Sequence, residues 1–226
     1  MSARSNILTR IRKALRERVP RPPEPHAGEV FSAIPPADLM ARFEKELLDL
    51  KAEFHRALNW ADAQAWVHEI ARANQIHKVV VMPHDDSREA TRLLNPPSQG
   101  DFALNGRVLT GADDCGHRLA DVDLGVTVCD CLVACTGSVV LTTQTGFGRT
   151  LSVLPPAHLV VARRSQLVAH LADAYHLLQS RYGRAMGGWP SMMTIITGPS
   201  RTADIEKILV LGAHGPKKLF VLLLDF

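Results

Sequence analysis

The sequence lacks a hydrophobic run long enough to cross a membrane. Its longest apolar stretches are short, such as residues 219–224, whereas a membrane-spanning helix needs about 20 apolar residues. The N-terminal residues also lack the apolar core of a secretory signal peptide. Four cysteines among 226 residues are too few for a disulfide framework. These absences predict a cytoplasmic protein without a membrane span.

Aromatic residues and net charge are scarce as well. Aromatic residues make up 5% of the chain, hydrophobic residues 46% and charged residues 22%, a balance that excludes a disordered chain and leaves core building to aliphatic side chains. Residues 1–18 hold six basic residues and one acidic residue, which give +5 and leave −2 of the total +3 for the remainder. Because only the N-terminal arm is basic, we expect no nucleic-acid partner.

Several motifs with known chemistry are missing. The sequence has no Walker loop, no Gly-x-Gly-x2-Gly, no His-Glu-x2-His and no Gly-x-Ser-x-Gly. Cys129, Cys131 and Cys135, with Cys115 upstream, match neither the paired zinc spacing nor the ferredoxin run. We expect these cysteines to serve as small core side chains, and a metal site or a reactive thiol is the alternative.

The chain divides by composition into two parts. Residues 1–36 predict a basic helical arm, capped by Ser5 or Asn6, followed by a proline-rich linker. Apolar residues of the arm recur at helical spacing, which suits docking on a partner or on a second copy of the chain; they are Ile7, Leu8, Ile11 and Leu15. Residues 37–226 predict one α/β domain.

Hydrophobic periodicity predicts alternating elements in that domain. Helices are predicted at 37–57, 61–74, from 85–87 to 94, 165–180 and, as a turn or longer, 202–207. Strands are predicted at 78–82, 107–109, 122–128, 138–143, 157–162, 192–197 and 219–224. Short apolar strands alternating with helices indicate a mostly parallel sheet flanked by helices.

The strongest local signal is an apolar strand that runs into a Gly-Pro-Ser-Arg-Thr turn. If Thr202 starts a helix, the free amides of its first turn favour a phosphate or carboxylate, and Arg201 adds a charged planar fork. The turn therefore predicts an anion site; its residues are Gly198, Pro199, Ser200, Arg201 and Thr202. An ordinary strand–turn–helix junction is the alternative.

Two further segments suggest a binding site. Gly137 permits close backbone approach and its neighbours Thr136 and Ser138 carry hydroxyl groups. Gly146 and Gly148 suggest a hairpin loop or lid whose Arg149 could face an anion, or simply a hairpin turn. His214 stands on a sharp Gly/Pro turn, as an acid–base group or as an ordinary turn histidine.

These segments together resemble a known family. Residues 197–207 and 209–216, together with 136–138, 148–149 and 151–158, resemble the LUD-domain family, specifically its lactate utilization protein C branch. The resemblance covers nearly the whole chain and implies a fold like that of the sugar-phosphate isomerase and CoA-transferase superfamily.

The resemblance also implies a function. The chain would be an accessory subunit of a system that oxidises L-lactate to pyruvate, with iron–sulfur clusters on two partner proteins and no cofactor bound by this chain. The family usually has an acidic residue where Cys135 stands, so a comparable carboxylate would come from Glu206 or Asp204. Glu206 and His214 are the catalytic candidates, and a free-standing enzyme acting on an acyl-CoA or a sugar phosphate is the alternative.

Overall fold

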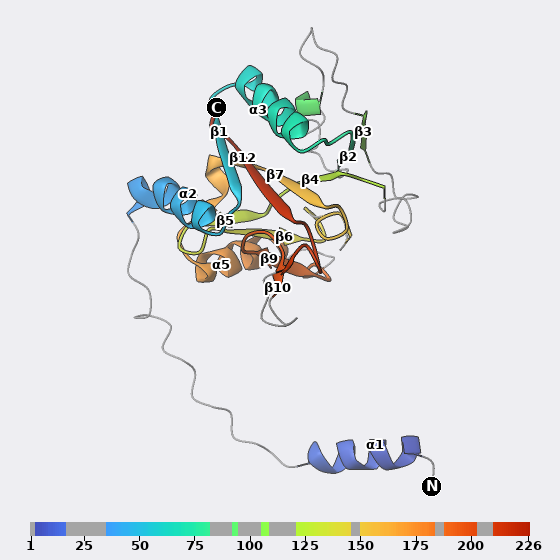
Figure 1. Cartoon of the computed structure of the whole chain (residues 1–226). Coiled ribbons are helices and arrows are strands. Elements are labelled where there is room, and N and C mark those ends of the chain that lie inside the picture. Colours follow the sequence, from blue (N-terminus) through green and yellow to red (C-terminus); the bar gives the residue numbers. More distant parts are fainter. Residues whose placement is uncertain are drawn as a thin grey trace. The chain divides into compact units, whose positions relative to one another are not determined.

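The computed structural model describes residues 3–16, 35–81, 92–94, 105–108, 121–145, 150–183, 188–202 and 210–226. The chain separates into two units, Met1–Ser32 and Ala33–Phe226. The first unit contains helix α1 (Ala3–Ala14), which is drawn in Figure 1. None of its side chains is buried. The predicted helical arm is confirmed, although the helix already includes Ser5 and Asn6, which were expected to cap it.

The second unit is built on a six-stranded sheet with the order β1-β12-β7-β4-β2-β3 (Figure 1). All neighbouring strands in this central sheet are parallel, which confirms the predicted sheet type. The strands are β1 (Glu53–Ala57), β2 (Lys78–Val81), β3 (Asn105–Val108), β4 (Leu124–Val128), β7 (Ala157–Arg163) and β12 (Lys218–Leu224).

A second, four-stranded sheet has the order β8-β5-β6-β9. Its strands are β5 (Cys131–Val133), β6 (Ser138–Thr142), β8 (Leu167–Val168) and β9 (Met193–Ile196). The β5–β6 and β6–β9 pairs are antiparallel, whereas β5 and β8 are parallel. This separate sheet was not predicted, because periodicity finds strands but does not say which strands pair.

Helices cover the outer faces of both sheets. Helix α3 (Trp60–Ala73) packs on one face of the central sheet, while α2 (Leu39–Asp49) and the second sheet pack on the other. Helix α5 (Leu171–Tyr182) packs on the far face of the second sheet (Figure 1). None of the described helices has the length and apolar character needed to span a membrane.

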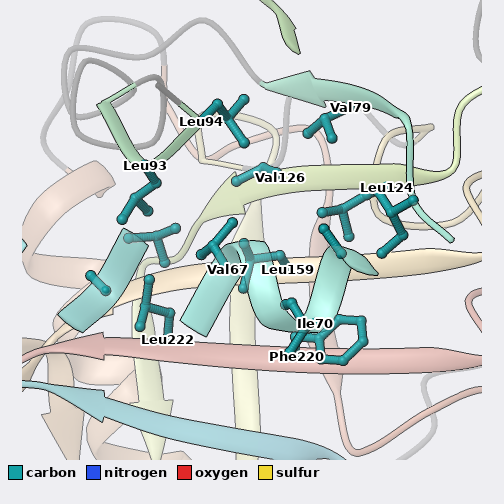
Figure 2. Packing of buried hydrophobic residues seen from close by; sticks show 14 of the residues in the cluster. Val67, Ile70, Val79, Leu93, Leu94, Leu124, Val126, Leu159, Phe220 and Leu222 are labelled. Carbon is teal, nitrogen blue, oxygen red and sulfur yellow. The ribbon is translucent and has the colours of Figure 1, made fainter. Parts of the chain in front are cut away.

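Alternation along the strands divides the core into layers. On β7, Leu159 and Val161 join the cluster beneath α3, together with Val67 and Phe220 (Figure 2). The alternate residues of β7 face the second sheet, where Val160 packs in a separate cluster. We call this layer between the two sheets the inter-sheet layer.

Two predicted helices are wrong in extent. The helix predicted at 37–57 ends at Asp49, because Lys51 takes a left-handed backbone conformation with φ 68° and Glu53–Ala57 pairs with β12. The helix predicted from 165 begins at Leu171. Before it come a short 3-10 helix (Arg164–Gln166) and β8. The Asp173 carboxylate then accepts a hydrogen bond of 2.9 Å from the His170 amide, which fixes the start of α5.

The other elements follow the sequence closely. Helix α3 is confirmed, with Asn59 as its cap through a hydrogen bond of 2.9 Å from the Asp62 amide. The strands predicted at 78–82, 107–109, 122–128, 138–143, 157–162, 192–197 and 219–224 are confirmed within a few residues. Of the helix predicted up to Leu94, only residues 92–94 are described, and these are helical.

Candidate functional site: a cavity in the inter-sheet layer

A cavity of about 220 Å³ opens at one end of the inter-sheet layer. It is lined by residues 152–153, His158, 194–200, 214–216 and Leu219. Since His158 and Leu219 are the second residues of β7 and β12, the cavity lies at the amino end of the central strands and at the carboxyl end of β9. In open α/β sheets, ligands are expected at the carboxyl ends of the strands. Here that position holds only for β9, which belongs to the second sheet.

The predicted turn Gly198-Pro199-Ser200 lines this cavity. Thr202 does not start a helix, however, because β10 (Arg201–Thr202) pairs antiparallel with β11 (Val210–Leu211). The rest of the helix predicted at 202–207 lies outside the described residues. The Ser200 amide donates to the Pro216 carbonyl at 2.9 Å, and the Ser200 carbonyl accepts from Gly212 at 3.0 Å. The proposed corner of free amides is thus a strand-to-strand connection, and the Ser200 amide is already used within the fold.

Of the charged residues expected at the site, only Arg201 belongs to the part of the chain that the structure describes. Arg201 is exposed and neither it nor Thr202 lines the cavity. Arg149, Asp204 and Glu206 lie outside the described residues, so their roles as ligand-binding or catalytic residues stay predictions. Gly198 has φ 86°, and a Cβ atom there would lie 3.0 Å from the Leu50 Cβ, so the turn also needs glycine to pack against the end of α2.

The Thr136-Gly137-Ser138 segment forms a structural junction. The Ser138 hydroxyl lies 2.8 Å from each of the Thr136 and Thr197 hydroxyl oxygens. Gly137 has φ 60°, and a Cβ atom there would lie 2.5 Å from the Leu47 backbone nitrogen. The segment therefore approaches the backbone of α2, as the glycine predicts, but it does not line the inter-sheet cavity.

His214 does line the cavity, as an exposed residue between β11 and β12. Gly212 has φ 77°, which confirms the sharp turn. His214 also lines a neighbouring hollow of about 400 Å³, together with Lys217. Val153 and Gly215 are shared by the two hollows in the same way, so these residues form a common wall.

A second histidine at the cavity, His158, was not predicted. Its side chain is fully buried, and its Nε2 lies 2.8 Å from the Thr127 hydroxyl oxygen. Its Nδ1 is buried without a hydrogen-bond partner. Burial lowers the pKa of His158 to about 4, because the charged imidazolium is poorly solvated there. His158 is therefore neutral at physiological pH.

The lining also carries several hydroxyl groups. Ser152 is 4% exposed, and its hydroxyl has no partner within the described parts of the chain. Thr194 and Ser200 supply further hydroxyl groups. No Lys, Arg, Asp or Glu occurs among the described lining residues. The arrangement can donate several hydrogen bonds to the oxygen atoms of a small molecule.

The structure confirms the predicted core role for two of the four cysteines. Cys129 and Cys131 are buried free thiols, packed in different clusters, while Cys135 is half-buried. Burial raises the pKa of Cys131 to about 12 and that of Cys129 well above its usual value, so both are protonated at neutral pH. Within the described ranges no three His, Cys, Asp or Glu side chains gather as metal ligands would; Cys115 lies outside those ranges.

Asp130, the carboxylate beside these cysteines, is buried and fully partnered. It accepts hydrogen bonds from Thr145 at 2.6 Å and Tyr182 at 2.7 Å. Arg181 adds an ion pair at 3.0 Å. Because Arg181 and Tyr182 come from the last turn of α5, Asp130 ties that helix to the second sheet. Its role in the described structure is structural.

Sequence reasoning missed His158, Thr127 and Ser152. His158 and Ser152 lie in the 151–158 segment that carries part of the family resemblance, but no spacing marks either residue as functional. The available signal was a polar residue within an otherwise apolar strand, since His158 interrupts the run 157–162. Thr127 occupies the same kind of position in β4.

Comparisons with known proteins agree with this architecture. A model of the LUD domain family matches residues 40–224. "Lactate utilization protein C" of Anoxybacillus flavithermus is 28% identical over 214 residues, covering 94% of this chain and 93% of that protein. The protein of the same name from Shouchella clausii is 38% identical over 103 residues, but the match spans less than half of each chain, 46% and 44%.

A solved structure supports the fold alone. The crystal structure of a DUF162 family protein from Deinococcus radiodurans has a TM-score of 0.56 and 20% sequence identity. The superposition covers 85% of this chain and 99% of that one. The architecture of the Ala33–Phe226 unit is therefore shared with an experimentally determined structure.

Proposed function

Because this chain belongs to the LUD domain family, we propose that it acts in lactate utilization as an accessory subunit of a system that oxidises L-lactate to pyruvate. The observation that carries this proposal is the alignment with a "Lactate utilization protein C" over 94% of this chain and 93% of that protein. The oxidation releases two electrons and two protons. In this proposal the electrons pass to iron–sulfur clusters on partner subunits.

The N-terminal arm is the proposed docking element for such a partner. Its apolar residues are exposed. The exposed fractions are 58%, 40% and 49% for Ile7, Leu8 and Ile11 on α1, and 79% for Leu15, which directly follows the helix. An amphipathic helix with an uncovered apolar stripe buries that stripe on assembly. Loss of the arm should therefore weaken assembly with the partner subunits while leaving the Ala33–Phe226 unit folded.

A growth experiment tests the function. A strain lacking the gene should fail to grow on L-lactate as sole carbon source, and should grow normally on pyruvate, which enters metabolism after the proposed step. The full chain should restore growth on L-lactate, and a chain without residues 1–32 should restore it poorly. Normal growth of the deletion strain on L-lactate would refute the assignment.

A free-standing enzyme acting on an acyl-CoA or a sugar phosphate is the second candidate. The observation in its favour is the hollow of about 400 Å³ beside the cavity, where Lys217 could meet a phosphate group. Under this alternative, the purified chain alone should turn over at least one compound in a panel of both classes, and Glu206→Gln should abolish that turnover. Inactivity of the pure protein across the panel would leave the accessory role as the better account.

A further inference from the structure

We propose that the inter-sheet cavity binds a small 2-hydroxy or 2-oxo carboxylic acid, and that the Nδ1–H group of His158 donates a hydrogen bond to one of its oxygen atoms. The choice of acid class rests on the proposed function. The donor role of His158 rests on its place in the cavity lining and on its unpartnered Nδ1 atom. Four features carry the argument: the position of the imidazole proton, the depth of the donor, the size of the cavity and its polarity.

The position of the proton follows from the contact between His158 and Thr127. Nε2 lies 2.8 Å from the Thr127 hydroxyl oxygen, and this is the only hydrogen bond of that hydroxyl within the described structure. If the hydroxyl donates to Nε2, its proton is used and the imidazole proton lies on Nδ1. The opposite tautomer would leave both the hydroxyl proton and Nδ1 unpaired, so the geometry favours Nδ1–H.

The donor is deeply buried at the cavity. His158 is fully buried, and Nδ1 has no partner in the described structure. A buried donor without an acceptor destabilises the fold, so a buried histidine held in this way by Thr127 needs an explanation. Its place in the cavity lining supplies one, because a bound oxygen atom would complete its hydrogen bonding.

The size of the cavity limits the ligand. A volume of about 220 Å³ corresponds to about seven water molecules at roughly 30 Å³ each. This space suits a molecule of about six to ten non-hydrogen atoms by the same measure. A short-chain hydroxy or oxo acid fits within this space, whereas a nucleotide or an entire coenzyme A would extend beyond it.

The polarity of the cavity selects a molecule rich in acceptors. Besides His158, the hydroxyl groups of Ser152 and Ser200 can donate, and the described lining contains no carboxylate that would demand a donor. Among the described lining residues there is also no lysine or arginine to supply a counter-charge to a phosphate dianion. A single carboxylate can instead be held by neutral donors through charge-assisted hydrogen bonds. Pro199 and Leu219 offer apolar contacts to a short carbon chain.

Calorimetric titration of the purified full-length protein tests the inference. L-lactate or pyruvate should bind about tenfold or more tightly than propionate, which lacks the oxygen on the second carbon. Inorganic phosphate should not bind measurably. His158→Phe should weaken binding of the acid by about tenfold or more, since an anion loses one hydrogen-bond donor.

Two control pairs make the result specific. His68→Phe replaces another buried histidine with an unpartnered ring nitrogen, on α3 and away from the cavity, and should leave binding unchanged. Thr127→Val should weaken binding because it removes the group that fixes the tautomer, and Thr127→Ser should restore it. If circular dichroism shows that His158→Phe does not fold, the Thr127 pair decides the question.

The possible failures are distinguishable. Absence of binding of both acids to the wild-type protein, or unchanged affinity in His158→Phe, would overturn the inference even if the deletion strain still failed to grow on L-lactate. If the purified protein binds the acid through His158 but the deletion strain grows normally on L-lactate, the site stands and the proposed function is refuted.

Discussion

The two faces of the central sheet are built from the same strands but differ in chemistry. Beneath α3, Leu124, Leu159 and Phe220 form part of a buried hydrocarbon cluster (Figure 2). On the opposite face, β4 and β7 hold Thr127 and His158, and His158 lines the cavity. The first face stabilises the fold by burying apolar surface, whereas the second keeps a buried polar pair that a purely structural sheet would not need.

The largest change in stability should come from a substitution on the hydrocarbon face, the face of the central sheet beneath α3. Leu159→Ala removes a fully buried side chain and should lower the free energy of unfolding by about 2–5 kcal/mol. Urea denaturation followed by circular dichroism measures this change. Leu58→Ala, at an exposed position (61% accessible), is the control and should have little effect. A loss in Leu159→Ala no larger than in the control would contradict the division between the faces.

The buried histidine of the polar face should make the stability of the protein depend on pH. The pKa of His158 is lowered to about 4 in the folded protein, whereas it is about 6.5 in the unfolded chain. The unfolded state therefore binds a proton first, and stability should fall as the pH drops from about 6.5 to 4, by about 3 kcal/mol from this group. Denaturation across that range should show the extra loss in the wild type and not in His158→Phe. Parallel pH profiles for the two proteins would argue against a buried neutral imidazole.

The substitution Gly125→Ala, on the polar face, should affect both the stability of the protein and its binding of the acid. Gly125 pairs with His158 across the sheet, and a Cβ atom there would lie 2.5 Å from the Leu151 carbonyl oxygen. Gly125→Ala should lower stability by about 2 kcal/mol through overpacking and should weaken acid binding, because it displaces the segment that carries Ser152.

Gly188→Ala is the matched control for this substitution. Unlike Gly125, Gly188 has a left-handed backbone, at φ 68°, but a Cβ atom there would meet nothing within 4 Å. It should lose about 1 kcal/mol and bind the acid normally. Equal effects of the two substitutions on binding would show that the 151–152 segment does not shape the cavity.

The smallest change in stability should come from replacing the polar pair itself. The double substitution Thr127→Val with His158→Phe removes both hydrogen-bonding partners together, so it should change stability by no more than about 1 kcal/mol, in the stabilising direction. Titration calorimetry should nevertheless show loss of acid binding. A strongly destabilised double variant would mean that the pair is structural.

Much of the fold could be predicted because buried parallel strands read as continuous apolar runs, as at β2 and β12. Strand β1 was missed because Phe54 and Leu58 continue the helical spacing of α2. Only the pairing of Glu53–Ala57 with β12 makes that segment a strand. The sequence contains the local preference, but the long-range partner overrides it.

Part of the cavity lining could be predicted, because Gly/Pro turns are visible in the sequence. Gly198, Ser200 and His214 belong to such turns, and these residues do line one cavity. His158 and Thr127 could not be predicted, because their contact joins residues 31 positions apart on two strands whose register no local pattern encodes. Gly137 correctly indicated a close backbone approach, but its neighbour is α2.

The most direct test of the account is nitrogen-15 NMR of the histidine side chains in the wild-type protein, with His158 assigned by comparison with His158→Phe. The account predicts a neutral His158 ring with its proton on Nδ1 at pH 7, and a shift of the Nδ1–H signal when L-lactate or pyruvate is added. A proton on Nε2, or an Nδ1 signal unmoved by saturating amounts of both acids, would contradict it.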